Sequence, residues 1–191
     1  LFHPKSERAM AILKVSRMGH PVLRQRAKDI PPEEITNPPL QRLVADMVET
    51  MVDYEGIGLA APQVYRSLRL IVLGMPDVDP EEEGVIPLTV LFNPEFIAMS
   101  EDRVDGWEGC LSIPDIRGVV PRSAAVKVKG LDVEGQQVEF AAEGFFARVL
   151  QHEIDHLDSV LFLDRMEGFE TLAYFEEYQR YWIEEEEGEE E

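Results

Sequence analysis

The segment QHEIDH, residues 151–156, constrains this chain most strongly, because it places two histidines four positions apart inside a predicted helix over residues 143–160. Residues with this spacing lie on the same face of a helix, so the imidazoles of His152 and His156 can reach one metal ion. Glu153 can approach a water on that ion without ligating the metal, and it can accept the proton that the ion makes acidic. The same pattern also arises by chance in proteins without a metal, so the interpretation requires a third ligand.

Cys110 is the best candidate for that third ligand. It lies in WEGCLSIP, residues 107–114, a segment that turn-forming residues flank. A single cysteine is commonly a small buried hydrophobic residue, but a thiolate with two imidazoles suits zinc or ferrous iron. Three protein ligands also leave a fourth position for water, which is the arrangement of catalytic sites. The other histidines are weaker candidates, since His3 lies in the first nine residues and His20 in a predicted turn.

The hydrophobic pattern predicts the class of fold. Apolar residues recur at helical spacing over residues 40–52, and strand-like segments precede the helix that contains the histidines. Strands followed by a helix that packs against them predict an α+β fold. The other predicted segments are loops over 56–63 and 75–87, strands over 68–73, 88–92 and 95–99, an irregular segment over 107–114, a hairpin of strands 126–129 and 137–140, and a third helix over 169–182.

The charge of the chain disfavours one class of partner. A formal net charge of −20 over 191 residues opposes binding to DNA, or to other nucleic acids, through general charge. The single cysteine excludes an internal disulfide, and no stretch is long and apolar enough to span a membrane. No signal-peptide pattern opens the sequence, so the cytoplasm is the expected location.

The length fits one domain. We interpret residues 1–9 as the remnant of an expression tag, before a natural start at Met10, and residues 10–183 as a single catalytic domain. Residues 184–191 form an acidic tail that is expected to be disordered, because such a run favours a solvated end over a binding element.

Three blocks of sequence together are similar to the motifs of a known family, the bacterial-type peptide deformylases. The blocks follow one another in the family's order and spacing, and two shorter segments extend the similarity across residues 10–166. The motifs are GIGLAAPQ at 56–63, EGCLS at 108–112 and QHEIDH at 151–156, and the shorter segments are GHPVLR at 19–24 and VVPR at 119–122.

The resemblance implies an activity and a metal. Members of the family remove the N-formyl group from the initiator formyl-methionine of nascent polypeptides and release formate. By this resemblance Cys110, His152 and His156 ligate one divalent ion, natively Fe²⁺, with Zn²⁺, Ni²⁺ or Co²⁺ able to replace it. Metal-bound hydroxide attacks the formyl carbon, and Glu153 acts as general base and then as general acid. The implied fold is α+β, with antiparallel strands packed around the central metal-binding helix.

The resemblance also assigns residues that contact the substrate. Gln63 and the backbone N–H of Leu111 form an oxyanion hole, and Gly58 helps to hold the peptide. A tight turn of small residues with a solvated amide would explain Gly58 and Gln63 equally well if the metal motif were absent. Glu108 can orient a ligand through an ion pair with Arg122, although an ordinary surface pair is an alternative interpretation.

The pocket for the methionine side chain is predicted from helical spacing. Val149 and Arg148 precede His152 by three and four residues, and Phe145 lies one turn further back, so these residues can approach the rim of the site. Phe145 and Val149 would supply an apolar wall, unless they belong to the core. An exposed cation at Arg148 would meet the peptide backbone or an acidic partner.

The resemblance leaves the mode of ribosome contact open. Some members of the family dock on ribosomal RNA through a basic C-terminal helix. This chain ends in EEEEGEEE at residues 184–191, so it has no evident basic helix for that purpose. A transient encounter with the ribosome in another orientation remains open.

Two other functions compete with a deformylase. A zinc endopeptidase would use the same helix with a His or Glu as third ligand, so that replacing Cys110 would leave metal binding intact. The metzincin extension is absent, because Ser159 and Phe162 occupy its glycine and histidine positions, and acids such as Glu170 lie in an acid-rich segment where acids are expected anyway. A non-catalytic binding module would typically lack Glu153 or Gln63, and both are present.

Overall fold

The structure is a computed structural model that describes residues 11–79, 82 and 84–183. The tag predicted at residues 1–9 and the tail predicted at 184–191 lie outside the described residues. The helices are α1 (Pro38–Asp53), α2 (Gly144–Leu157) and α3 (Phe175–Tyr181), with short 3₁₀ helices η1 (Pro21–Arg24), η2 (Pro32–Glu34), η3 (Ala61–Val64) and η4 (Phe162–Asp164). The strands are β1 (Gly58–Ala60), β2 (Leu70–Leu73), β3 (Thr89–Met99), β4 (Arg103–Cys110), β5 (Ile113–Ser123), β6 (Ala125–Leu131), β7 (Gln137–Glu143) and β8 (Ala173–Tyr174).

The strands form two antiparallel sheets. The larger sheet has the order β1-β2-β3-β6-β7, and the smaller one has the order β4-β5-β8. The predicted hairpin is confirmed, since β6 and β7 pair from Ala125↔Glu143 to Leu131↔Gln137. The two strands predicted over 88–92 and 95–99 form the single strand β3, whose register shifts twice along β6. The predicted α+β class is therefore correct.

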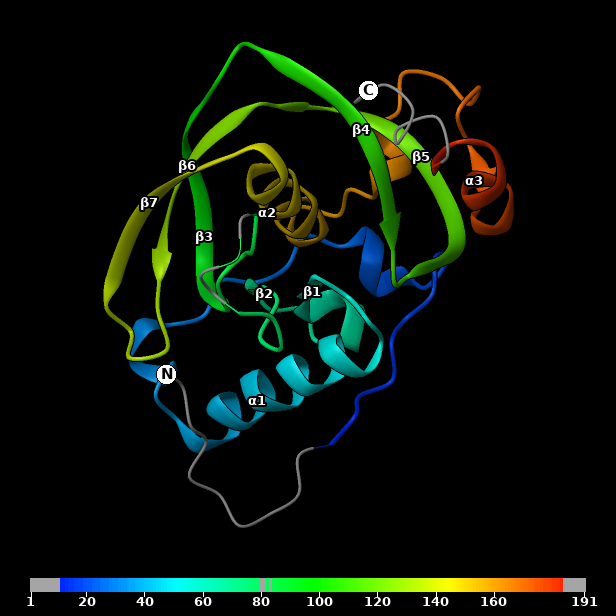
Figure 1. Cartoon of the computed structure of the whole chain (residues 1–191). Helices are drawn as coiled ribbons and strands as arrows, with labels where there is room; N and C mark the ends of the chain where they lie inside the picture. The colour runs from blue at the N-terminus through cyan, green and yellow to red at the C-terminus, as the bar shows by residue number, and fades with distance from the viewer. Residues whose placement is uncertain (1–10, 80–81, 83, 184–191) are drawn as a thin grey trace.

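The helix α2 occupies the centre of the fold. Figure 1 shows it enclosed by the strands, with α1 on the far side of β1 and β2. All of its residues from Ala147 to Leu157 are buried, because one side packs into the core of the larger sheet and the other faces β4 and β5. The apolar positions that do so recur at helical spacing. They are Ala147, Leu150, Ile154 and Leu157.

Three predicted segments differ from the structure. Residues 56–63, predicted as a loop, contain the short strand β1 and most of η3. Residues 107–114, predicted as irregular, belong to the hairpin of β4 and β5, in which Trp107 lies opposite Val119. The prediction failed because Gly106 and Gly109 disfavour a strand, whereas here long side chains from other segments fill the space beside each glycine. The helix predicted over 169–182 is shorter, since β8 precedes α3. Among the described residues, no helix has the length and apolarity to cross a membrane.

Candidate metal centre

The three predicted metal ligands converge at one point. Cys110 ends β4, while His152 and His156 project from the same face of α2. One ligand atom from each lies within 4.8 Å of the others, and Cys110 Sγ is 3.3 Å from His156 Nε2. The helix brings the histidines together locally, whereas the hairpin of β4 and β5 brings the cysteine to them.

A buried carboxylate orients the first histidine. Glu108 Oε2 lies 2.9 Å from His152 Nδ1. Glu108 also receives two hydrogen bonds from Arg122, of 2.8 and 3.0 Å, and burial alone would raise its pKa, but the hydrogen bonds from His152 and Arg122 lower the pKa to about 2. A carboxylate in this form only accepts hydrogen bonds, so the proton of the imidazole lies on Nδ1 and the lone pair on Nε2 is free for a metal. The surface-pair interpretation of Glu108 and Arg122 is wrong, because both side chains are about 5% exposed.

The environment of Cys110 favours the thiolate form, which is a strong electron donor to a metal ion. Burial raises the pKa of the thiol, but His156 and His152 outweigh this effect and lower the pKa well below its ordinary value. The backbone N–H of Ser112 points at the sulfur from 3.4 Å. A thiolate beside two imidazoles is a donor set that a divalent cation fits.

Glu153 is buried beside the centre with an unsatisfied oxygen. Its side chain is 4% exposed, and burial raises its pKa to about 7. Among the described residues, its Oε2 atom has no hydrogen-bond partner. Gly58 in β1 makes room for this carboxylate, because a Cβ atom on Gly58 would lie 2.7 Å from Glu153 Cδ. The family resemblance assigns Gly58 to the substrate, and the sequence did not reveal this steric reason for a glycine.

The amide of Gln63 is fixed with its donor side toward the centre. Its Oε1 accepts a hydrogen bond of 2.8 Å from the backbone N–H of Ala60, which leaves the NH₂ group facing Cys110 Sγ at 3.5 Å and Ser112 Oγ at 3.3 Å. The alternative interpretation of Gln63 as a solvated loop amide is therefore excluded, since Gln63 is 1% exposed. Leu111 is half-buried and follows the cysteine directly, and its side chain packs against Gly56.

The residues predicted to line a methionine pocket have different environments. Val149 is 8% exposed and belongs to the core that α2 shares with the larger sheet. Phe145 is 49% exposed and lines a pocket of about 430 Å³ between the start of α2 and the strands β4 and β5, together with Val104 and Arg148. Val149 does not line this pocket.

The prediction of an exposed cation at Arg148 is wrong. The guanidinium donates hydrogen bonds to the carbonyl oxygens of Val104, Gly106 and Val120 and lies 3.0 Å from Glu108 Oε1. It fills the space beside Gly106, where a Cβ atom would lie 2.7 Å from Arg148 Nη2. Helical spacing correctly predicts the face of α2 on which Arg148 lies. The hydrogen-bond partners of Arg148 belong to β4 and β5, so the local sequence does not reveal them. We propose that Arg148 positions Glu108, and through it His152.

Removal of this guanidinium should destabilise the fold. In Arg148→Met, three carbonyl oxygens and one oxygen of Glu108 lose a donor, and we expect the free energy of unfolding to fall by roughly 2–4 kcal/mol in urea denaturation. The matched control is Arg180→Met, because Arg180 is exposed, and it should change that free energy by less than about 0.5 kcal/mol. Unchanged stability with a raised KM would instead restore Arg148 as a substrate contact.

Comparison with known proteins gives one consistent result. Residues 12–171 match the polypeptide deformylase family. Peptide deformylase 1 of Bordetella pertussis is 43% identical over 167 residues, which are 87% of this chain and 92% of the relative. Peptide deformylase 2 of Nostoc is 40% identical over 169 residues, covering 88% and 93%. A structure of the class I type b peptide deformylase of Acinetobacter baumannii bound to Met-Ala-Ser has a TM-score of 0.77 at 38% identity, covering 83% of this chain and all of that one.

The fold and the geometry of the site already indicate the class of protein to which this chain belongs. A helix that presents two imidazoles to one point, with a carboxylate between them in the sequence, is the arrangement of helix-borne metallohydrolases. A cysteine at the third position separates this chain from the peptidases that use His or Glu there. The chain belongs to the polypeptide deformylase family.

Proposed function

We infer that this chain is a peptide deformylase, which hydrolyses the formyl amide of N-formylmethionyl nascent peptides and releases formate. The observation that supports this best is the convergence of Cys110, His152 and His156 beside the buried carboxylate of Glu153. We propose that the three residues hold one divalent ion, and the family resemblance favours Fe²⁺ as the native one. Thiolate and imidazole ligands suit Zn²⁺, Ni²⁺ and Co²⁺ as well. Such an ion, when bound, makes a water more acidic and polarises the formyl carbonyl.

Two strands with a free edge flank the centre and can bind an extended peptide. Among the described residues, β1 pairs as a strand only with β2, and β4 only with β5, although Arg148 donates to two carbonyl oxygens of β4. A peptide gains backbone hydrogen bonds when it lies along such an edge. We propose that the substrate lies between β1 and β4, with its formyl group at Cys110 and its backbone against Gly58. Phe145 and Val149 are the proposed apolar contacts of the methionine side chain.

Glu153 and Gln63 perform the proposed proton and charge chemistry. Glu153 Oε2 accepts a proton from the attacking water and returns it to the leaving nitrogen, since an amide nitrogen leaves poorly unless it is protonated. The NH₂ group of Gln63 and the backbone N–H of Leu111 donate to the oxygen of the formyl group as negative charge develops there. The hydrogen bond from Ala60 to Gln63 Oε1 orients this donor before the substrate binds.

Loss of the Gln63 donor should slow the reaction without weakening substrate binding. We expect Gln63→Leu to lower kcat by about 10²–10³-fold, the usual cost of one oxyanion donor. Stopped-flow measurement of formate release gives kcat and KM separately. A KM effect with unchanged kcat would contradict the assignment, because it would mean that Gln63 contacts substrate and transition state equally.

Formate release from formyl-Met-Ala-Ser tests the function as a whole. The chain is purified anaerobically, its metal content is measured, and parallel samples are loaded with Fe²⁺, Ni²⁺ or Co²⁺. We expect about one ion per chain and formate from each loaded form. Cleavage of an internal peptide bond instead would indicate the endopeptidase, and no formate from any loaded form would overturn the proposal.

The substrate also suggests where the enzyme acts. Formylated nascent chains arise at the ribosome, so we propose a cytoplasmic location and a transient encounter with the ribosome. The strong negative charge of the chain supports an encounter that does not depend on general attraction to RNA.

A further inference from the structure

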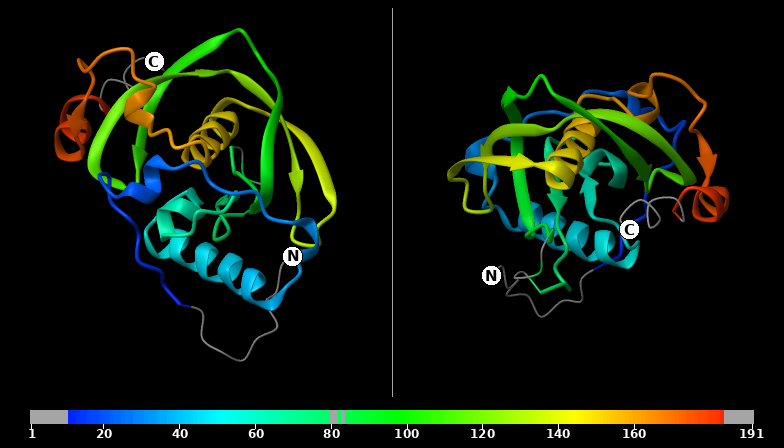
Figure 2. Two further views of the ribbon diagram at one scale, coloured as in Figure 1. Left: turned by 180° about the vertical axis from the view of Figure 1, so that it is seen from behind. Right: turned by 45° about the horizontal axis from the view of Figure 1, so that its top comes forward.

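The hairpin of β4 and β5 is covered on both faces. Side chains alternate along β4, so Glu108 and Cys110 face α2 while Trp107 faces the other side. On that side the Trp107 ring packs against the rings of Tyr178 and Trp182, with centroid distances of 4.7 and 5.3 Å. Figures 1 and 2 show α2 inside the hairpin and α3 outside it.

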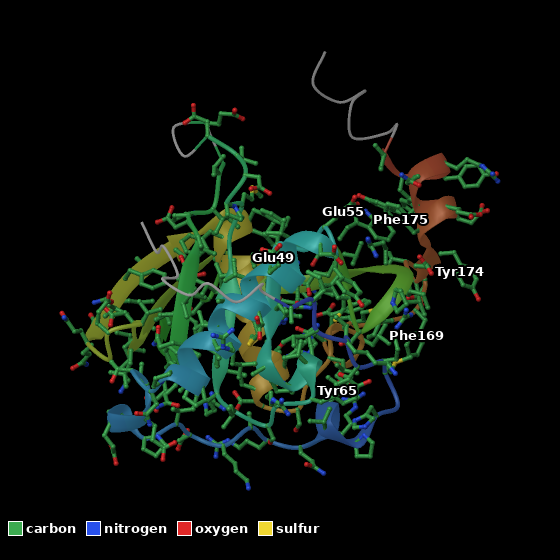
Figure 3. All side chains as sticks on the ribbon, turned by 90° about the horizontal axis from the view of Figure 1, so that it is seen from below. Glu49, Glu55, Tyr65, Phe169, Tyr174 and Phe175 are labelled. Carbon is green, nitrogen blue, oxygen red and sulfur yellow. The ribbon has the colours of Figure 1, made fainter. Side chains whose placement is uncertain are left out.

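A second contact lies beside the cysteine itself. A Cβ atom on Gly109 would lie 2.6 Å from Arg117 Nε, so the guanidinium of Arg117 rests against the backbone that directly precedes Cys110. The ring of Phe175 lies on Arg117, with its centroid 4.5 Å from the guanidinium carbon. Figure 3 labels Phe175 on this side of the molecule and Tyr174, which is 70% exposed, as its neighbour.

The segment that makes these contacts lies beyond the family match. The match ends at Thr171, whose Oγ1 accepts a hydrogen bond of 3.1 Å from the backbone N–H of Val119. After it, β8 adds a third strand to the hairpin by pairing with β5 at Ile116 and Arg117. Residues 172–182 thus contact the hairpin through a strand pair, a cation–π contact and an aromatic cluster.

We propose that residues 172–182 brace the β4–β5 hairpin from outside and thereby hold the free edge of β4 in the position that the peptide requires. The inference rests on the proposed function, in which this edge binds the substrate backbone. An unsupported edge strand has more conformational freedom, and a peptide that binds it must order it, which weakens binding. The side chain that transfers the proton, Glu153, lies on α2, and the side chain that stabilises the oxyanion, Gln63, lies on η3. Residues 172–182 therefore act on peptide binding and not on the chemical step.

The test removes the aromatic cluster and keeps the rest of the segment. In Tyr178→Ala with Trp182→Ala we expect KM for formyl-Met-Ala-Ser to rise about 10-fold, with kcat within about twofold of the unsubstituted chain. The absorption spectrum of the Co²⁺-loaded protein should not change, because the ligands stay in place. Tyr181→Ala is the matched control, since Tyr181 is 58% exposed on the same helix, and the pair Tyr178→Phe with Trp182→Phe should restore most of the affinity.

Three other outcomes would contradict the proposed role of residues 172–182 or replace its test. An unchanged KM with lowered thermal stability would mean that the segment only stabilises the fold. A lower kcat with an altered Co²⁺ spectrum would mean that it supports the metal ligand. If the double variant does not fold, Phe175→Leu is used in its place. We expect this variant to raise KM about threefold, which corresponds to the loss of one cation–π contact. Tyr174→Leu is its control and should leave KM unchanged. Failure of the proposed function is recognised separately, because the unsubstituted chain would then release no formate.

Discussion

Glu153→Ala should bind its metal ion as the unsubstituted chain does and release formate at least about 10³-fold more slowly. The ion is held by other side chains, so the metal content should stay near one per chain. The Oε2 atom of the carboxylate, in contrast, has no hydrogen-bond partner among the described residues, and the side chain lies buried beside the three ligands. Its removal leaves water to accept and return the proton, and water is neither fixed in place nor a strong enough base.

Glu153→Gln separates proton transfer from the space that the side chain fills. Glutamine has the same shape but cannot accept the proton, so we expect the same loss of kcat as in the alanine variant. The KM for formyl-Met-Ala-Ser should change by less than about threefold in both variants, because the carboxylate acts in the transition state. Formate release at the full rate in either variant would contradict the proposed mechanism. Loss of the metal in both would mean that Glu153 is a ligand.

The part of the site that could be predicted is the part that local spacing determines. Two histidines four residues apart lie on one helical face in any fold that keeps the helix, so His152 and His156 follow from the sequence. The contact of Cys110 with that helix depends on a hairpin that local preferences disfavour, since glycines at 106 and 109 oppose a strand. The resemblance to a family supplied this contact, and the physical pattern alone supplied only a suitable donor.

The interpretations that the structure excludes concern side chains whose partners come from distant segments. Arg148 has the spacing of a rim residue, but Glu108 and three strand carbonyls surround it, so it is buried. Gln63 follows a run of small residues that is typical of a solvated turn, and yet the backbone of Ala60 and the side chain of Ser112 enclose its amide. In both cases the polar group is buried because its hydrogen bonds are satisfied, which a one-dimensional pattern does not reveal.

Gly58→Ala should lower kcat about 10²-fold, through a displaced carboxylate and not through lost peptide contacts. The added methyl group would lie 2.7 Å from Glu153 Cδ, which is closer than the atoms can approach, so the side chain of Glu153 has to move. A shift of about 1 Å in a catalytic group is enough for such a loss. The alternative, in which Gly58 serves only to admit the peptide, predicts a raised KM and an unchanged kcat.

A double-mutant cycle distinguishes these two roles of Gly58. If the methyl group acts by displacing Glu153, then Gly58→Ala should cost nothing further in a chain that already has Glu153→Ala, because the space is empty there. The residual rate of the double variant should equal that of Glu153→Ala alone, a coupling of about 10²-fold between the two positions. Independent effects would instead multiply, and the double variant would be about 10²-fold slower than Glu153→Ala. That result would mean that Gly58 does not act by displacing Glu153, since a displaced carboxylate can have no effect once the side chain has been removed.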